Sequence, residues 1–372
     1  MSAAADGPII PDYNGANVRG IIPALLGPAT WTSGLPVWMP EPVVQANAVV
    51  VLVLDGLGWD QLQEHRDLMP TVAAMTGGPI HTVAPTTTAT ALTSITTGLT
   101  PAEHGLVGYR IVVGGDVMNV LRWSVGDQAV RRSHPPRDVQ PFEPFLGQTV
   151  PVVSVAELQT SAFSEAHLRG SDPVGWRAAS SIAVQARFEI EAGERFVYCY
   201  YGGIDKIAHE RGFGPFYDAE LRAADRLVGD VLESLPAGTA LLVTADHGQV
   251  HVGDRLVTPS TELLSTVTLQ SGEGRFRWLH SARGAVDDLA AIAADELGHL
   301  AWVVTKDQML DEHWFGAAMA PSVRSRLGDV ALVAHEPVSF HDPADSGPFA
   351  LVCRHGSLTS AEVNVPLVGE LT

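Results

Sequence analysis

The sequence predicts an α/β protein built on an open, mostly parallel sheet with helices on both faces. Four short, nearly uninterrupted apolar runs indicate strands that are buried on both faces, as parallel strands are. The stretches between them have helical character, so strands and helices alternate along the chain. A chain of 372 residues is long enough for one large domain that carries an insertion. The four runs are 48–54, 149–155, 195–201 and 239–244, and the two clearest helical stretches are 176–189 and 217–235.

The remaining segments define the expected domain organisation. Glycine and proline are frequent at the start of the chain, which indicates an irregular arm lying over a domain. A later region combines a polar strand-like piece, GRFRWLH, with an amphipathic helix and a short strand, which indicates a small α+β cap. The runs DVALVA (329–334) and FALVCR (349–354) then resemble returning strands of the core. We therefore expect an N-terminal arm (1–45), a catalytic core (46–250 plus 326–372) and an inserted cap (251–325).

Within the cap, Arg275, Arg277 and Trp278 are candidates for substrate contact. The simpler interpretation places them on an exposed strand face.

Composition and charge exclude several classes of protein. With 46% apolar and 17% charged residues, the chain is neither disordered nor fibrous. A net charge of -19 gives no general attraction for nucleic acid or for anionic membranes. Cys199 and Cys353 are too few for a disulfide framework and are expected to be buried thiols. No apolar run approaches the roughly 20 residues of a membrane helix and no secretory signal is evident, so we expect a cytoplasmic protein without nucleic-acid or membrane partners.

Several acidic and histidine residues follow the predicted strands. Taken singly, each has an ordinary interpretation as a turn residue, a surface ion pair or a loop histidine. Taken together, they would meet at the carboxyl edge of one sheet, where α/β proteins bind ligands. Oxygen and imidazole donors suit zinc, with manganese possible, and six donors suit two ions about 4 Å apart. The set is Asp55, Asp205, His209, Asp246, His247 and His355.

A threonine-rich segment follows Pro85 and continues to Gly98. It resembles a strand-to-helix junction followed by a helix of small residues. A hydroxyl at such a junction lies beside free N–H groups that favour a phosphate. One of these threonines is therefore a candidate nucleophile for attack on a phosphate ester.

The order of these motifs resembles the alkaline phosphatase superfamily, and within it the type I phosphodiesterase and nucleotide pyrophosphatase branch. The resemblance covers about residues 48–250 and 325–370. It implies an alkaline-phosphatase-like core, with a mostly parallel central sheet, helices on both faces and a small α+β cap insertion. After Asp55, the motifs are PTTT (85–88) followed by TGLTPAEHG (97–105), DKIAH (205–209), ADHG (245–248) and HGSLTSAEVNVPL (355–367).

The resemblance also implies roles for these residues. In that branch the nucleophilic threonine stands three positions after a proline and ten before the glycine of a Thr-Gly pair, which here selects Thr88. Thr88 would form a phosphothreonine intermediate, and His104 would fix the turn that follows the helix. One zinc would be held by Asp205, His209 and His355, and the other by Asp55, Asp246, His247 and the Thr88 oxygen.

Two positions depart from the pattern of the branch. Ala89-Thr90-Ala91 follows the nucleophile where Phe-Pro-Asn is usual. Tyr109 stands where an asparagine normally donates a hydrogen bond to a phosphate oxygen. Replacement donors would be the Tyr109 hydroxyl, the Ala89 N–H, Arg110 or Lys206, of which the Tyr109 hydroxyl is the natural choice. The simpler interpretations are a packed aromatic ring at Tyr109 and a solvent-facing side chain at Lys206.

The sequence therefore predicts a phosphoric ester hydrolase with two divalent metal ions. The resemblance favours a phosphodiesterase or nucleotide pyrophosphatase acting on a small phosphate ester or a nucleotide-like molecule. The missing asparagine makes a phosphomonoesterase the nearest alternative, and a phosphonate hydrolase of related architecture is another. A phosphosugar mutase and a non-catalytic zinc-binding protein are further alternatives, although six intact ligands together with Thr88 argue against a loss of turnover.

Overall fold

The computed structural model describes residues 7–27, 34–345 and 350–372. Its main sheet has seven strands in the order β2-β19-β10-β1-β9-β7-β8. The five strands from β10 to β8 run parallel, and β19 is antiparallel to both of its neighbours. The strands are β2 (Thr76–His81), β19 (Asn364–Leu371), β10 (Thr239–Thr244), β1 (Ala48–Leu54), β9 (Phe196–Tyr201), β7 (Pro151–Val155) and β8 (Asp172–Trp176).

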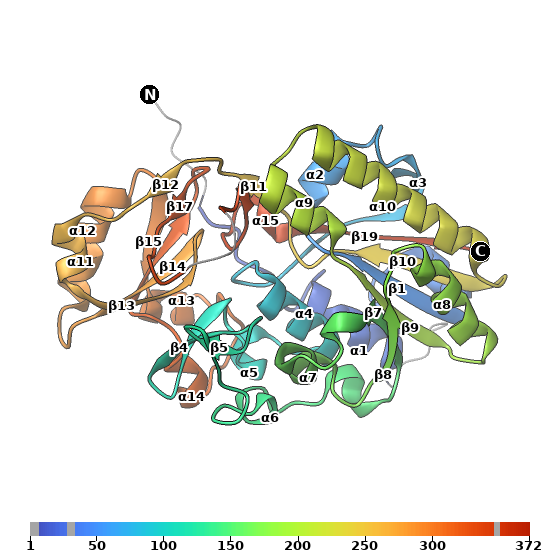
Figure 1. The fold of residues 1–372 in the computed structure, drawn as a ribbon, viewed down its shortest axis with the longest axis horizontal. Coiled ribbons are helices and arrows are strands. Elements are labelled where there is room, and N and C mark those ends of the chain that lie inside the picture. The colour runs from blue at the N-terminus through green and yellow to red at the C-terminus, as the bar shows by residue number, and fades with distance from the viewer. Residues whose placement is uncertain (1–6, 28–33, 346–349) are drawn as a thin grey trace.

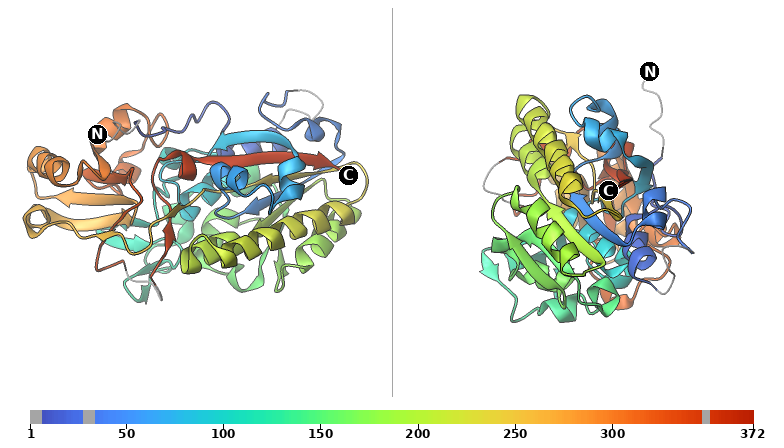
Figure 2. Two further views of the ribbon diagram at one scale, coloured as in Figure 1. Left: turned by 90° about the horizontal axis from the view of Figure 1, so that it is seen from above. Right: turned by 90° about the vertical axis from the view of Figure 1, so that its right-hand side faces the viewer.

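Helices cover both faces of the main sheet, as the sequence predicts (Figures 1 and 2). The long α10 packs with α8, α9 and α3 on one face, while α4 packs with α1 and α7 on the other. The helices are α1 (Ile21–Leu26), α2 (Trp59–Glu64), α3 (Pro70–Ala74), α4 (Thr88–Thr97), α7 (Ala162–Leu168), α8 (Ser181–Glu191), α9 (Gly203–Arg211) and α10 (Pro215–Ser234).

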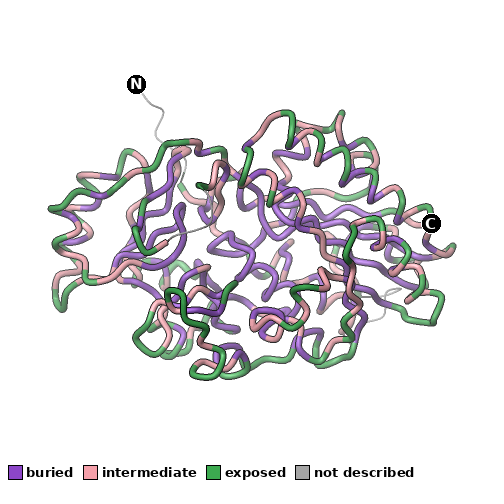
Figure 3. The backbone as a smooth tube through the Cα atoms, viewed as in Figure 1, coloured by how far each residue is buried: buried purple, intermediate pink, exposed green. Residues whose placement is uncertain are grey.

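Strand β1 lies at the centre of the sheet because its sequence, AVVVLVL, suits burial on both faces. All seven of its residues are buried (Figure 3). It pairs in parallel with β10 on one side and β9 on the other, so the carboxyl ends of the three strands lie at one edge. Strand β19 runs the opposite way, which brings the loop before it to the same edge. This edge collects the polar residues that follow the strands.

A second sheet lies apart from the first, at the left of Figure 1. It has the antiparallel order β13-β14-β16-β15, with α12 packed on β15 and β16 and α11 beside it. The prediction that 329–334 returns to the main sheet is wrong, because that strand is β16 and pairs with β14 and β15. These elements are β13 (Val267–Glu273), β14 (Phe276–Ser281), β15 (Ala301–Thr305), β16 (Val330–Ala334), α11 (Thr261–Ser265) and α12 (Val286–Leu297).

Shorter pairings complete the strand structure. A small antiparallel sheet, β3-β4-β5-β6, follows α4 and α5. Of the strand expected over 349–354, residue 349 lies outside the described residues, and only β18 forms, pairing with β11 instead of the main sheet. These elements are α5 (Pro101–His104), β3 (Arg110–Val113), β4 (Asp116–Asn119), β5 (Ser124–Val125), β6 (Gln128–Ala129), β11 (Val250–His251), β12 (Leu256–Val257), β17 (Ser339–Phe340), β18 (Cys353–Arg354) and α15 (Ser360–Val363).

Two further expectations need correction. The helix predicted from residue 176 begins only at Ser181, because Trp176 ends β8. Arg275, Arg277 and Trp278 do not form an exposed strand face: their exposed fractions are 0%, 1% and 2%, because both arginines are paired with acids inside the molecule. Cys199 and Cys353 are buried thiols, as predicted. Among the described residues, no helix is long and apolar enough to cross a membrane.

Candidate active site

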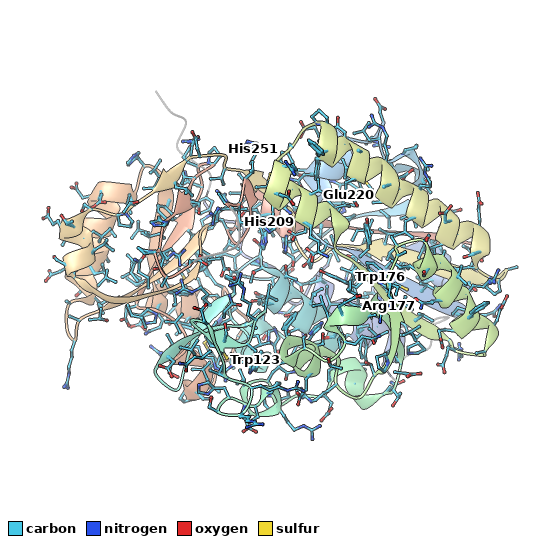
Figure 4. The ribbon with its side chains drawn as sticks, viewed as in Figure 1. Trp123, Trp176, Arg177, His209, Glu220 and His251 are labelled. Carbon is cyan, nitrogen blue, oxygen red and sulfur yellow. The ribbon has the colours of Figure 1, made fainter. Side chains whose placement is uncertain are left out.

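The six predicted metal ligands lie together at the carboxyl edge of the main sheet. Asp55 follows β1, Asp205 lies in the first turn of α9 after β9, and Asp246 and His247 follow β10. His355 lies in the loop before α15 and β19. His209 is one turn along α9 from Asp205, at the end of the helix that faces the second sheet (Figure 4). The strand topology therefore brings together residues that are up to 300 positions apart in the chain.

One group of ligand atoms consists of Asp205, His209 and His355. The Nε2 atom of His209 lies 3.1 Å from Asp205 Oδ1 and 3.3 Å from His355 Nε2. His355 Nε2 lies 3.9 Å from the same carboxylate oxygen. One atom from each side chain thus faces a common point, at the short separations expected of groups that ligate one cation.

A second group surrounds His247. Its Nε2 lies 3.5 Å from Asp55 Oδ1, 3.4 Å from Asp246 Oδ2 and 3.1 Å from Thr88 Oγ1. The imidazoles of His247 and His355 stack with centroids 3.6 Å apart, so the two groups are immediate neighbours. Asp55 Oδ1 and Asp246 Oδ2 are buried and accept no hydrogen bond from the described residues.

Each of the three histidines is oriented by a backbone carbonyl. The Nδ1 atoms of His209, His355 and His247 lie 2.7 to 3.0 Å from the carbonyl oxygens of Cys353, Thr86 and Gly248, respectively. A carbonyl only accepts, so Nδ1 carries the proton and the Nε2 lone pair faces the other ligands. Metal-binding histidines are held in this way in many proteins.

The electrostatics of this edge also fit cations. Burial raises the pKa of Asp55 well above its usual range, and the carboxylates of Asp246 and Asp205 raise it further. Burial also raises the pKa of Asp246. Burial opposes the ionisation of Asp205, but the adjacent His209 imidazole lowers the pKa of this carboxyl. Burial lowers the pKa of His355, and the neighbouring imidazoles of His247 and His209 lower it further.

Divalent cations would stabilise this edge in two ways. They would offset the repulsion among the three clustered carboxylates, and they would give partners to the buried oxygens of Asp55 and Asp246 that accept no hydrogen bond. Neutral imidazoles and carboxylates are donors that Zn²⁺ accepts readily. The residues present therefore fit metal ions.

Thr88 is the first residue of α4, and Thr87 is its N-cap. The sequence places a helix here because its small residues pack closely: all ten helical residues are buried, and Gly98 ends the helix with φ of 74°. The first N–H groups of a helix have no carbonyl within it to bond. The Thr88 hydroxyl therefore lies where unpaired N–H groups and the helix dipole favour an anion.

Tyr109 and Thr88 line one cavity of about 280 Å³, together with His209 and His355. The Asn119 Oδ1 atom accepts the Arg122 N–H (3.0 Å), so its Nδ2 must face the Tyr109 hydroxyl, at 2.6 Å. An amide nitrogen only donates, so the Tyr109 oxygen accepts this bond and its own proton remains available. Burial raises the pKa of Tyr109, which keeps that proton on the phenol.

The other predicted substrate-binding residues differ in their placement. Arg110 pairs with Asp342 at 2.5 Å and lines a different cavity, so the structure does not bring it to Thr88. Ala89 is fully buried in the first turn of α4, beside the nucleophile. Lys206 is exposed and lines a cavity that also contains Thr88.

Two cavities meet at Thr88 and Asp205. The first, of about 280 Å³, has the charged residues Arg122, Glu273 and Arg354 in its walls and is the more polar of the two. The second, of about 270 Å³, is mostly apolar and extends between α4, α7 and the ends of β7 and β9. Its apolar lining includes Leu92, Leu121, Val155, Phe163, Leu168 and Tyr198. A group bound at Thr88 would thus have a separate space on either side.

Several supporting residues were not identified from the sequence. The Tyr200 hydroxyl donates to Asp55 Oδ2, and Gln249 Nε2 donates to Asp205 Oδ1 at 2.7 Å. The signal for Tyr200 lay in the run FVYCYY, where alternate residues share a face and Tyr200, the next-to-last residue of β9, pairs with Val53 near the end of β1. His104 has the structural role predicted for it: its Nδ1 accepts the Leu106 N–H and its Nε2 lies 2.8 Å from Ser94 Oγ.

Gly56 is required because the loop after β1 packs closely against the start of α9. Its φ of 80° is left-handed, and a Cβ atom there would lie 3.0 Å from the Asp205 backbone. The Asp-Gly pair after β1 thus combines a ligand with the space that a neighbouring ligand needs.

Comparisons with known proteins agree with this geometry. The model of the type I phosphodiesterase/nucleotide pyrophosphatase family matches residues 49–358. Among solved structures, murine ectonucleotide pyrophosphatase/phosphodiesterase 5 aligns with a TM-score of 0.65 at 14% identity, over 87% of this chain and 88% of that one. An inactive variant of that murine protein was solved in complex with AMP, and it aligns with a TM-score of 0.64 at 14% identity, with the same coverage.

Phosphonoacetate hydrolase from Sinorhizobium meliloti 1021, in complex with phosphonoformate, aligns with a TM-score of 0.63 at 16% identity, over 87% of this chain and 90% of that one. No curated protein gives a significant match. These structures show the shared fold, and the family model covers most of the sequence. The chain belongs to the type I phosphodiesterase/nucleotide pyrophosphatase family of the alkaline phosphatase superfamily, a family of metal-dependent phosphoric ester hydrolases.

Proposed function

We propose that this protein hydrolyses a small-molecule phosphodiester or pyrophosphate with Thr88 as the nucleophile. The Thr88 oxygen forms a bond to phosphorus as the bond to the leaving oxygen breaks; the hydroxyl proton ends on the leaving oxygen, and Thr88 becomes a phosphothreonine. Water then attacks this phosphorus and breaks its bond to Thr88. The water's oxygen leaves with the phosphate monoester, and one of its protons restores the Thr88 hydroxyl.

The observation that carries the proposal is the position of Thr88. Its Oγ1 lies at the start of α4 and 3.1 Å from His247 Nε2, within one ligand group and beside the other. The hydroxyl donates to this nitrogen, because Nδ1 already carries the imidazole proton. Helix N–H groups and the ligand group of His247 thus converge on one side-chain oxygen, and the other ligand group lines the same cavity as Thr88.

The two ligand groups would each hold one divalent cation, and their donors suit zinc, with manganese also compatible. Asp205, His209 and His355 would hold one ion. Asp55, Asp246, His247 and the Thr88 oxygen would hold the other. When bound, the ions supply positive charge that stabilises the oxygens on which negative charge develops.

Residues of the chain would hold the remaining phosphate oxygens. The Tyr109 proton is free to donate into the cavity that Thr88 lines, and we assign it the role usually filled by asparagine. The N–H of Ala89 is a second donor, because it lies in the first turn of α4. Lys206 is placed to contact the substituent in the apolar cavity.

The pair of cavities favours a diester or pyrophosphate over a monoester. A phosphorus atom at Thr88 would direct one substituent into the polar cavity and another into the apolar cavity. A monoester has only one such substituent and would leave one cavity to water. A phosphonate hydrolase is the second candidate, because a structural neighbour of this fold is phosphonoacetate hydrolase with phosphonoformate bound.

The proposal is tested by Thr88→Ala with Thr90→Val as a matched control. Thr90 is buried in the same helix and its hydroxyl has no partner among the described residues, so its loss should leave turnover unchanged. Thr88→Ala should lower kcat by about 10⁴-fold or more toward bis(p-nitrophenyl) phosphate, as expected for a lost nucleophile. Metal analysis should still find bound metal ions in the variant.

Turnover of Thr88→Ala at the wild-type rate would refute the assignment of the nucleophile. Parallel assays of p-nitrophenyl phosphate and p-nitrophenyl phenylphosphonate distinguish the classes of substrate. A monoester hydrolysed faster than the diester would contradict the two-cavity interpretation.

A further inference from the structure

A fully buried ion pair joins the second sheet to the loop that carries His355. Arg275 lies in the turn between β13 and β14, and Glu362 lies in α15; both side chains have an exposed fraction of 0%. The guanidinium contacts both carboxylate oxygens, with Nε–Oε1 at 2.8 Å and Nη2–Oε2 at 2.9 Å. Its remaining hydrogen bonds go to the carbonyls of Ala334, Glu336 and Val338.

Glu362 also holds the loop in which His355 lies. Its Oε1 accepts the Ser357 N–H at 3.0 Å, and its Oε2 accepts the Thr359 hydroxyl at 2.6 Å. The Ser357 hydroxyl donates to the carbonyl of Ala334 in β16, at 2.6 Å. The loop is therefore attached to the second sheet at more than one point.

Thr86 continues these contacts to the nucleophile. Its hydroxyl donates to the Ser357 carbonyl (2.9 Å) and accepts the Gly356 N–H (2.9 Å). Its own carbonyl accepts the proton of His355 Nδ1 at 2.8 Å. An unbroken series of hydrogen bonds thus runs from Arg275 to the imidazole of His355 and to the residue two positions before Thr88.

Stability alone does not account for such a pair. A buried ion pair is often no more stabilising than apolar residues of the same size, because both charges lose their hydration. A two-pronged arginine contact does fix the relative orientation of the groups that it joins. The groups joined here are the second sheet and the loop of a predicted metal ligand.

We propose that Arg275 is a positioning residue, which sets the orientation of the His355 imidazole through Glu362, Ser357 and Thr86. This inference rests on the proposed function, in which His355 holds one of two metal ions. It predicts that a change at Arg275 weakens binding of the ion held by Asp205, His209 and His355. Binding of the other ion should not change.

The test is Arg275→Lys, which keeps the charge and loses the two-pronged contact. Binding of one of two Zn²⁺ ions should weaken by about 10- to 100-fold, the usual effect of losing a residue that supports a metal ligand. Zn²⁺ affinities are measured by competition with a chelator. In the Co²⁺-substituted protein, the visible spectrum should change in the same bands that His355→Ala removes.

The matched control is Lys306→Met. It breaks the Lys306–Asp329 pair (2.8 Å), which also lies in the region of the second sheet and makes no hydrogen bond to the His355 loop within the described part of the chain. Both Zn²⁺ affinities should match those of the wild type. A loss of one ion in this control would show that any weakening of the second sheet suffices, and would overturn the role given to Arg275.

Thr86→Val provides a second test if Arg275→Lys fails to fold, because it removes the bridging hydroxyl and keeps the carbonyl that orients His355. It should weaken binding of the same Zn²⁺ ion. If folded Arg275→Lys binds both ions as the wild type does, this inference alone is overturned. The same holds for Thr86→Val if Arg275→Lys does not fold. Absence of Zn²⁺ binding by the wild type would overturn the proposed function and this inference with it.

Discussion

Replacement of Tyr109 by phenylalanine should slow turnover without unfolding the protein. The change removes one oxygen and keeps the ring. That oxygen already accepts a hydrogen bond from Asn119 Nδ2 at 2.6 Å, so the proton that is lost is the one available to the substrate. A hydrogen bond to a charged group contributes about 1.5–3 kcal/mol. Since about 1.4 kcal/mol corresponds to tenfold, kcat/KM should fall by about 10- to 150-fold.

The assay compares kcat/KM for a diester in Tyr109→Phe and in Tyr217→Phe. Tyr217 is fully buried in α10, and its hydroxyl has no partner among the described residues, so its removal should not affect turnover. Thermal melting confirms that both variants are folded. A folded Tyr109→Phe protein with kcat/KM within twofold of the wild type would refute the role of the Tyr109 proton.

Two further predictions concern the two cavities. Ser154 lines the apolar cavity of about 270 Å³, so Ser154→Phe should fill much of that cavity and raise KM for a diester, as measured by steady-state kinetics. An equal rise in KM for a monoester would contradict the two-cavity interpretation. Burial raises the pKa of Glu273 in the polar cavity to about 8, above its ordinary 4.5, so the folded protein keeps a proton that the unfolded chain releases. The stability associated with this group is therefore fully present below about pH 4.5 and is lost as the pH rises towards about 8. Glu273→Gln should remove this slope in urea unfolding of the metal-free protein between pH 5 and 8, and parallel wild-type and variant profiles would argue against it.

The main sheet was predictable because its strands are marked locally. The bounds of β1 and β10 agree with the predicted runs, since both are short, almost wholly apolar runs that contain β-branched residues, as buried parallel strands do. The site followed from the same strands, because the carboxyl ends of parallel strands lie at one edge. A ligand at the end of each strand is therefore visible without knowledge of any side-chain contact.

The second sheet was harder to predict because apolar pattern does not identify a strand's partner. The run 330–334 is buried and wholly apolar, like the core strand β1, yet it pairs with β14 and β15. The burial of Arg275 was equally hidden, since its partner Glu362 lies 87 positions along the chain. An arginine in a sequence is normally expected to be exposed, and only the pairing with the distant Glu362 makes burial of Arg275 favourable.

The carbonyl contacts of the three histidines have a consequence for how the protein acquires its metal ions. Because backbone groups already hold His209, His247 and His355, the entropy of ordering these side chains is lost during folding and not during metal binding. A site prepared in this way can release one ion and take up another while the chain stays folded. Since divalent ions compete for such donors in a general order of affinity, the metal in the working enzyme would be decided by which ions its surroundings supply.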